Sequence, residues 1–154
     1  RQMDVNFFGV VNTARHALPA LRHTQGRLAL ISSVSGLLCT PGVSAYSASK
    51  FAVRAVGLTL AQELHGSGVS CTTIYPGFVE SEIAQVDNQG QFHADRADNR
   101  PQWLMWSSAD AAQVIVRAIT RRKHEYVFTG HGKIGAWLGQ HCPGLAHFLI
   151  SRFA

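Results

Sequence analysis

The sequence predicts an α/β fold built on a parallel sheet, and two observations support this. Two apolar runs of strand length, Leu28–Ile31 and Val69–Tyr75, lie on either side of a long helical stretch, Ser44–Leu64. A strand, a helix and a second strand in this order form a βαβ unit, whose two strands are parallel. The 154 residues are 46% hydrophobic and 15% charged, which is typical of a globular domain with a core and argues against disorder.

The first part of the chain predicts a helix followed by a buried strand. Residues 1–22 carry apolar side chains at spacings of three or four, which indicates a helix already under way at the first residue: Phe7, Val10, Ala14, Leu18 and Leu21. Pro19 marks strain near the end of this helix. The continuous apolar run Leu28–Ile31 then indicates a strand that is buried on both faces.

The central helix is predicted over Ser44–Leu64, with Ser44 as its N-cap. It carries one stripe of small residues and one of bulky residues: Ala45, Ala48, Ala52 and Ala55, and Val53, Val56, Leu60 and Leu64. Gly66-Ser67-Gly68 ends the helix. Pro76-Gly77 closes the strand that follows it.

The remaining residues predict a loop, a helix, a short strand and a helical tail. Residues 80–102 are polar with little periodicity, and we expect a long mobile segment that serves as a lid or binding loop. A helix is predicted over Ser108–Thr120 and a third strand over Tyr126–Phe128. We therefore expect an α/β region over residues 1–130 and a C-terminal helical extension over residues 131–154.

Tyr46 and Lys50 are four residues apart on the central helix, so their side chains lie on one face. A tyrosine hydroxyl, with an ordinary pKa near ~10, is a poor general base at neutral pH. A lysine ammonium one turn away favours the phenolate, because a nearby opposite charge lowers the pKa of an acid. The pair alone is weak evidence, since such pairs on helices are more often solvated neighbours.

Ser33 follows the first strand, in the loop that leads back to the helix of Tyr46. Ligands of parallel α/β sheets bind outside the carboxyl ends of the strands, so the serine hydroxyl and the phenol can converge there. The alternative is a turn serine that bonds its own backbone. Other serines nearby are alternatives for the same role: Ser32, Ser35, Ser44, Ser47 and Ser49.

Four motifs together resemble the short-chain dehydrogenases/reductases. Ile31–Gly36 and Tyr46–Lys50 are similar to the active-site segment of this family. Val5–Gly9 is similar to the helix whose asparagine completes the family's catalytic tetrad. Tyr75–Val79 resembles the Pro-Gly turn under the nicotinamide, and Ser81 stands where the family usually has threonine.

The resemblance implies the C-terminal half of a Rossmann-type, doubly wound parallel sheet with extra C-terminal helices. It also implies an NAD(P)-dependent oxidoreductase that interconverts an alcohol and a carbonyl by hydride transfer. Tyr46 would be the general acid/base, and Ser33 would hold the substrate oxygen. Lys50 would lower the pKa of Tyr46 and bond the nicotinamide ribose, and Asn6 would hold a water that links Lys50 to solvent.

The cofactor is expected to contact Pro76, Gly77, Val79 and Ser81, together with Tyr46 and Lys50, by the same resemblance. The sequence does not decide between NAD and NADP, and NADP is our preferred choice. We find no glycine-rich turn of the kind that receives a pyrophosphate at a helix N-terminus. We therefore expect the N-terminal cofactor-binding half to be absent and this chain alone to be inactive.

Two other functions remain open at the level of sequence. The first is a truncated, noncatalytic protein that acts through the helices of Asn6 and Tyr46, by which the family forms homo-oligomers. The second is a sugar-nucleotide epimerase or dehydratase of the extended branch, which also uses Tyr-x-x-x-Lys. The Pro-Gly-Phe-Val turn with Ser81 favours the ordinary branch.

Charge and composition argue against several other classes. The net charge of +5 is scattered, without the basic stripe of a nucleic-acid-binding protein. The eight histidines show no zinc-binding spacing, so we expect no metal. Three cysteines without a CxxC suit a reducing compartment, and we expect a cytoplasmic protein. The apolar tail predicts a packed terminal helix, with membrane contact as the second choice.

Overall fold

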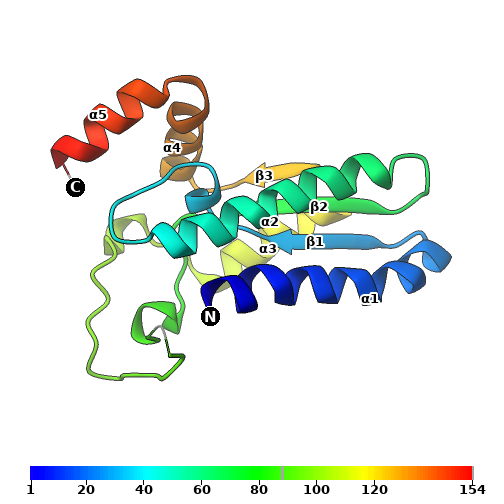
Figure 1. Ribbon diagram of the computed structural model, residues 1–154, viewed down its shortest axis with the longest axis horizontal. Coiled ribbons are helices and arrows are strands. Elements are labelled where there is room, and N and C mark those ends of the chain that lie inside the picture. Colours follow the sequence, from blue (N-terminus) through cyan, green and yellow to red (C-terminus); the bar gives the residue numbers. More distant parts are fainter. Residues whose placement is uncertain (88, 154) are drawn as a thin grey trace.

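The computed structural model describes residues 1–87 and 89–153. Its elements follow the expected order, opening with a π-helical turn and alternating helices with strands (Figure 1). In chain order they are the π turn Asp4–Phe8, α1 (Gly9–Thr24), β1 (Arg27–Ile31), α2 (Ser44–Glu63), β2 (Ser70–Tyr75), α3 (Ser108–Thr120), β3 (Glu125–Val127), α4 (Gly130–His141) and α5 (Pro143–Phe153). Short 3-10 turns lie at Val34–Gly36, Glu82–Gln85 and Gln102–Leu104.

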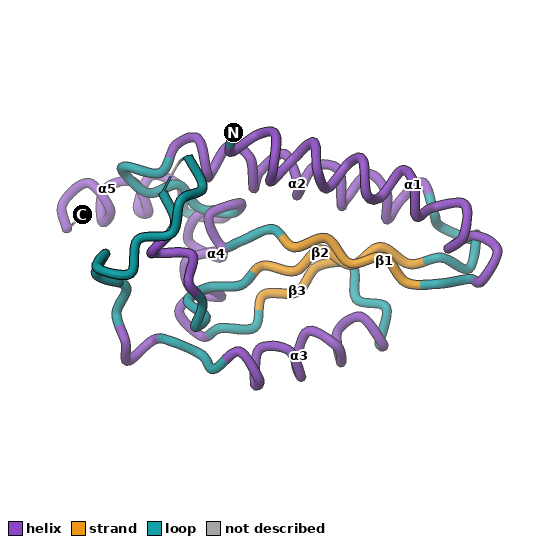
Figure 2. Tube along the Cα trace, turned by 90° about the horizontal axis from the view of Figure 1, so that it is seen from below, coloured by secondary structure: helices purple, strands orange, loops and turns teal. Residues whose placement is uncertain are grey.

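The three strands form one parallel sheet in the order β1-β2-β3. Its register pairs Leu28 with Cys71 and Ile74 with Tyr126. Figure 2 shows α1 and α2 on one face of the sheet and α3 on the other. The predicted α/β class, with a parallel sheet and helices on both faces, is confirmed.

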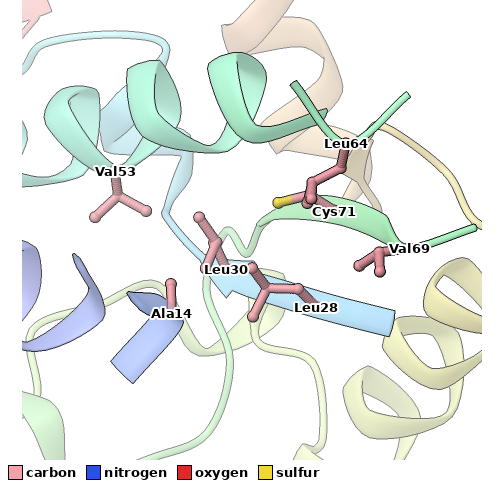
Figure 3. Close-up of a cluster of buried hydrophobic side chains, with 7 residues drawn as sticks. All are labelled: Ala14, Leu28, Leu30, Val53, Leu64, Val69 and Cys71. Carbon is pink, nitrogen blue, oxygen red and sulfur yellow. The ribbon is translucent and has the colours of Figure 1, made fainter. Parts of the chain in front are cut away.

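A hydrophobic core fills the space between the sheet and the helices α1 and α2 (Figure 3). Its buried members come from α1, β1, α2 and β2 and from the residues that adjoin them: Ala14, Leu28, Leu30, Val53, Leu64, Val69 and Cys71. A second cluster with Ile74, Ala111, Ala118 and Phe128 packs α3 against the opposite face. Because the strands are parallel, their carboxyl ends lie at one edge of the sheet.

The prediction that β1 is buried on both faces is wrong. Leu28 and Leu30 are buried, but Ala29 is half-buried and the side chain of Ile31 is 43% exposed. Successive side chains of a strand point to opposite faces. The helices α1 and α2 cover the face of Leu28 and Leu30, whereas α3 covers the other face of this edge strand only in part.

Two further predictions need correction, the N-cap of the central helix and the bounds of the third strand. Ser44 is the first residue of α2 and not its N-cap, which is Val43 without a side-chain cap. A capping residue must precede the helix in a non-helical conformation, and Ser44 is already helical. The third strand is Glu125–Val127 and not Tyr126–Phe128, because its pairing with β2 runs from Glu125 to Val127 and leaves Phe128 outside the ladder.

The predicted end of the central helix at the glycine-rich turn is confirmed. The central helix ends before two glycines with positive φ, Gly66 at 79° and Gly68 at 81°. The tail forms the two helices α4 and α5, the first of which begins at Gly130. Among the described residues, no helix combines the length and the apolar character that crossing a bilayer requires.

Candidate active site

The predicted site lies where β1 and β2 end, on the side from which the loops leave the sheet (Figure 1). Past the end of β1, the backbone N–H of Ser32 donates to the carbonyl oxygen of Ile74 at 2.8 Å. Two residues later, the N–H of Val34 donates to the carbonyl oxygen of Pro76 at 2.9 Å. The loop that carries Ser33 therefore lies directly beside the Pro-Gly turn that follows β2.

Lys50 points from α2 toward the end of β1. Its Nζ donates to the carbonyl oxygen of Ile31 at 3.1 Å and lies 5.6 Å from the centroid of the Tyr46 ring. Burial lowers the pKa of Lys50, because a partly dry environment disfavours the ammonium. The prediction that the two side chains share one face of the helix is confirmed.

The hydroxyl of Tyr46 donates to no other described residue, and the side chain is half-buried. Lys50 Nζ lies over the ring, and no hydrogen bond joins it to the hydroxyl. A phenol that is partly enclosed but unpaired remains available to a ligand in the same place.

Ser33 is the N-cap of the 3-10 turn Val34–Gly36, and its Oγ accepts the backbone N–H of Ser35 at 3.1 Å. This is the turn bond expected from the alternative explanation of Ser33. Since the hydroxyl acts here as an acceptor, its hydrogen remains free to be donated. The turn bond therefore orients Ser33 and leaves its hydroxyl able to donate a hydrogen bond.

Ser32 anchors the same loop to α2, a role that the sequence did not predict. Its Oγ donates to the carbonyl oxygen of Lys50 at 2.8 Å, and the residue is 3% exposed. Gly36 packs at this point, where a Cβ would lie 2.5 Å from the Ser32 Oγ and 2.8 Å from the Lys50 oxygen. The only sequence signal for this contact is the pair of adjacent serines that follows β1.

Asn6 lies in the π-helical turn and connects to Tyr46 through Ser49. Its Nδ2 donates to Gln2 Oε1 at 2.8 Å and to Ser49 Oγ at 3.1 Å. Ser49, which is fully buried, donates in turn to the carbonyl oxygen of Tyr46 at 2.7 Å. Asn6 therefore approaches the active-site helix by way of Ser49, and π-helical turns are frequent at functional sites.

The turn after β2 is held by Arg100, which the sequence also did not single out. The guanidinium donates to the carbonyl oxygens of Val79 at 3.1 Å and Ser81 at 3.0 Å. It also pairs with Asp98 at 2.7 Å, which lowers the pKa of that carboxyl to about 2 and raises that of Arg100. Arg100 thus ties the predicted lid to the backbone of the predicted cofactor residues.

Two backbone bridges lie beside and within the predicted lid, residues 80–102. Trp106 forms a parallel bridge with Val79. In this bridge the Trp106 N–H donates to the Phe78 carbonyl oxygen and the Glu80 N–H donates to the Trp106 carbonyl oxygen, each at 3.0 Å. Val86 and Phe92 form an antiparallel bridge within the segment. Among the described residues, Arg100 thus joins this segment to the turn after β2, and the mobility of the segment remains a prediction.

The nicotinamide end of a dinucleotide fits the groups that remain unpaired. Lys50 spends one N–H on Ile31 and keeps its other donors. Arg100 bonds the carbonyl oxygen of Val79, but the N–H of Val79 bonds to no described residue. Ser81 is exposed, and Arg100 bonds its carbonyl oxygen and not its hydroxyl. Within the described residues, no three His, Cys, Asp or Glu side chains gather so as to hold a metal ion.

Comparison with known families identifies the chain. The model of the short chain dehydrogenase family matches residues 1–91, which include Asn6, Ser33, Tyr46 and Lys50. This match spans more than half of the chain. The chain therefore belongs to the short-chain dehydrogenase/reductase family.

Curated relatives are considerably longer than this chain. The uncharacterised oxidoreductase YbbO of Escherichia coli is 39% identical over 102 residues, which are 66% of this chain and 37% of that protein. The 11-beta-hydroxysteroid dehydrogenase A of Sesamum indicum is 34% identical over 154 residues, covering 96% of this chain and 44% of its own length. The chain thus spans less than half the length of these relatives.

Solved structures confirm the fold. A short chain dehydrogenase from Burkholderia cenocepacia in complex with NADP superposes with a TM-score of 0.81 at 21% identity. The match covers 96% of this chain and 58% of that protein. A short-chain dehydrogenase from Streptomyces avermitilis matches the same shares at a TM-score of 0.71 and 23% identity. At these identities the likeness concerns the fold alone.

Proposed function

We propose that the chain provides the proton-transfer site of an NAD(P)-dependent oxidoreductase that interconverts an alcohol and a carbonyl. The observation that carries the proposal is the placement of Lys50 between the end of β1 and the Tyr46 ring, beside the Ser33 loop. These groups stand at the carboxyl edge of the parallel sheet, where α/β proteins bind their ligands.

In this proposal Tyr46 exchanges a proton with the substrate oxygen. During reduction its hydroxyl protonates the developing alkoxide, and during oxidation its phenolate removes the proton from the alcohol. The ammonium of Lys50, 5.6 Å from the ring centroid, stabilises the phenolate in either direction. The carbonyl of Ile31 fixes the position of Lys50 through one of its N–H groups.

Ser33 holds the same substrate oxygen by donating its free hydroxyl hydrogen, while its Oγ stays fixed by Ser35. Asn6 supports the helix of Tyr46 through Ser49. This contact differs from the water-holding role that the family resemblance implies for Asn6, and the two roles are compatible because the Oδ1 of Asn6 is not engaged by Gln2 or Ser49.

The cofactor would supply the hydride, while this chain would orient its nicotinamide end. Lys50 would bond the ribose, and the Val79 N–H with the Ser81 hydroxyl would hold the carboxamide. We propose NADP in preference to NAD, in line with the bound cofactor of the Burkholderia cenocepacia structure. The substrate would be a small molecule.

The test is a turnover assay of the full-length gene product. We expect oxidation of at least one member of a panel of secondary alcohols, or reduction of the matching ketones, followed by the absorbance of the reduced nicotinamide. Each substrate is assayed with NADP(H) and with NAD(H), and NADP(H) is expected to give the higher kcat/KM. A folded protein that turns over no member of the panel with either cofactor would refute the proposal.

A further inference from the structure

His131 connects the C-terminal helices to the turn that follows β2. It is the second residue of α4, and its Nε2 accepts the backbone N–H of Phe78 at 3.2 Å. Its ring also stacks on the Phe78 ring, with 5.1 Å between the centroids and an interplanar angle of 22°. The proposed proton transfer makes no use of this histidine.

The imidazole of His131 lies so close to the turn that only a glycine fits at position 77. A Cβ on Gly77 would lie 2.3 Å from His131 Nε2 and 2.4 Å from Thr129 Oγ1, which is far inside van der Waals contact. On its other side the turn is fixed by the hydrogen bond from Val34 N–H to the Pro76 oxygen. The turn is therefore clamped between the Ser33 loop and α4.

The hydrogen bond defines the protonation state of His131. A ring nitrogen can accept an N–H only while it carries no proton of its own, so the proton of the neutral ring must be on Nδ1. An imidazolium has two N–H donors and no acceptor, and it cannot make this bond. The start of α4 also disfavours a positive charge, because the helix dipole is positive at that end.

We propose that His131 is a positioning residue for the cofactor: its neutral ring holds Phe78 and thereby sets the Val79 N–H and the Ser81 hydroxyl for the nicotinamide. This inference rests on the proposed function. Uptake of a proton by His131 breaks the bond to Phe78, frees the turn and weakens cofactor binding. The residue acts through the backbone and does not touch the cofactor itself.

The ring has no charged partner among the described residues. The surrounding elements carry several titratable side chains: Glu80 after the turn, Lys133 and His141 on α4, and Cys71 and Tyr75 on β2, where Tyr75 bonds Glu125 of β3. None of these contacts the ring, which lies against the uncharged Gly77 and Phe78. Burial alone lowers the pKa of His131 from 6.5. Protonation is thus opposed by desolvation and by the lost hydrogen bond.

The sign of the pH dependence follows from this direction. Below pH 6.5 an unfolded or released histidine takes up a proton before the folded one does. The stabilisation of the turn is complete above pH 6.5 and is lost progressively as the pH falls. Asp98, which holds Arg100 on the same turn, has a pKa of about 2 and stays ionised throughout this range.

The experiment measures the dissociation constant of NADPH for the full-length gene product between pH 8 and pH 5. In the unsubstituted protein we expect the affinity to be constant at high pH and to fall by up to about tenfold per pH unit once His131 titrates. His131→Gln places an amide oxygen near the acceptor position and does not titrate. It should bind with near-normal affinity and without this pH dependence.

Two further variants complete the design. His131→Ala lacks the acceptor and should bind NADPH weakly at every pH. His141→Gln is the matched control, because His141 is exposed at the other end of α4 and bonds only the Trp137 carbonyl and ring. It should keep the pH profile of the unsubstituted protein. An unchanged profile in His131→Gln would overturn the inference and leave the proposed function standing.

Nitrogen NMR of the histidine rings tests the contact without any cofactor. We expect Nε2 of His131 to be unprotonated and Nδ1 to be protonated at neutral pH. A protonated Nε2 would overturn the inference by itself. If this tautomer is found but no NADPH binds at any pH, the proposed function fails, and with it the positioning role.

Discussion

At the scale of single residues, the site combines local and distant contacts. Tyr46 and Lys50 could be predicted because four residues of helix place them on one face, whatever the rest of the fold. The bond from Ser32 to Lys50 joins residues 18 apart, and that from Asn6 to Ser49 joins residues 43 apart. No periodicity encodes such pairs, since they exist only once the helices pack.

Arg100 shows the same limit of the sequence. It lies in the polar segment that has no periodic pattern, 21 residues from the Val79 carbonyl that it binds. Its partner Asp98 is close in sequence, but an Asp and an Arg two residues apart in a polar loop are ordinarily solvated. Only the fold shows that this pair holds the turn of the predicted cofactor site.

Ser49 gives a direct test of the connection between the two helices. Ser49→Ala removes the oxygen that accepts from Asn6 and donates to Tyr46, leaving a half-buried amide with one partner fewer. We expect a loss of about 1–3 kcal/mol in the free energy of unfolding, measured by urea denaturation of the full-length gene product.

Ser44→Ala is the matched control on the same helix. Ser44 is exposed and makes no cap bond, so its removal should change the stability by no more than about 0.5 kcal/mol. Equal stabilities of the two variants would contradict the contact between Asn6 and Ser49. A loss of stability in Ser44→Ala as large as that expected for Ser49→Ala would indicate that Ser44 caps the helix after all.

At the scale of elements, the sequence predicted the kinds of helix and strand but not their surroundings. The order of strand and helix and the glycines after Glu63 are local signals, and they were confirmed. The burial of β1 depends on what covers each face, which the composition of a four-residue run does not contain. For the same reason Ile31 was predicted to be buried and is exposed.

The small residues on α2 lead to a prediction about assembly. Ala45, Ala48 and Ala55 are exposed, and on the preceding helical segment Val5 and Phe8 are exposed as well. Such a surface allows two helices of neighbouring molecules to approach closely. We propose that the full-length gene product is a homo-oligomer through these helices.

Ala55→Glu tests this interface by sedimentation velocity. A carboxylate buried between two helices costs several kcal/mol, so the variant should sediment as a smaller species than the unsubstituted protein. Ala112→Glu makes the same change at an exposed position of α3 and should leave the size unchanged. Sedimentation of the unsubstituted protein as a monomer would contradict the proposal.

At the scale of the whole molecule, the chain gathers one functional edge from distant parts of the sequence. The Ser33 loop, the Tyr46 helix, the turn after β2 and the start of α4 all meet at the carboxyl end of the sheet (Figures 1 and 2). The chain spans 37% of the Escherichia coli relative and 44% of the Sesamum indicum relative. We propose that the pyrophosphate and adenosine of the cofactor bind outside these 154 residues.

The central claim is that Tyr46 carries the proton of the reaction. The most direct test is the kcat of Tyr46→Phe in the full-length gene product, measured with the best substrate of the panel. Positioned acid/base groups contribute about 10²–10⁴-fold to rates, so we expect kcat to fall by that factor while the NADPH dissociation constant stays within a few-fold.

Tyr126→Phe is the matched control. Tyr126 is also a tyrosine beside a lysine, since Lys123 Nζ lies 4.6 Å from the centroid of its ring, but it is on β3 and not on α2. It should retain kcat. A loss of about 10²–10⁴-fold in Tyr46→Phe alone is the result that the structure predicts. A kcat within a few-fold of the unsubstituted enzyme in Tyr46→Phe would contradict it.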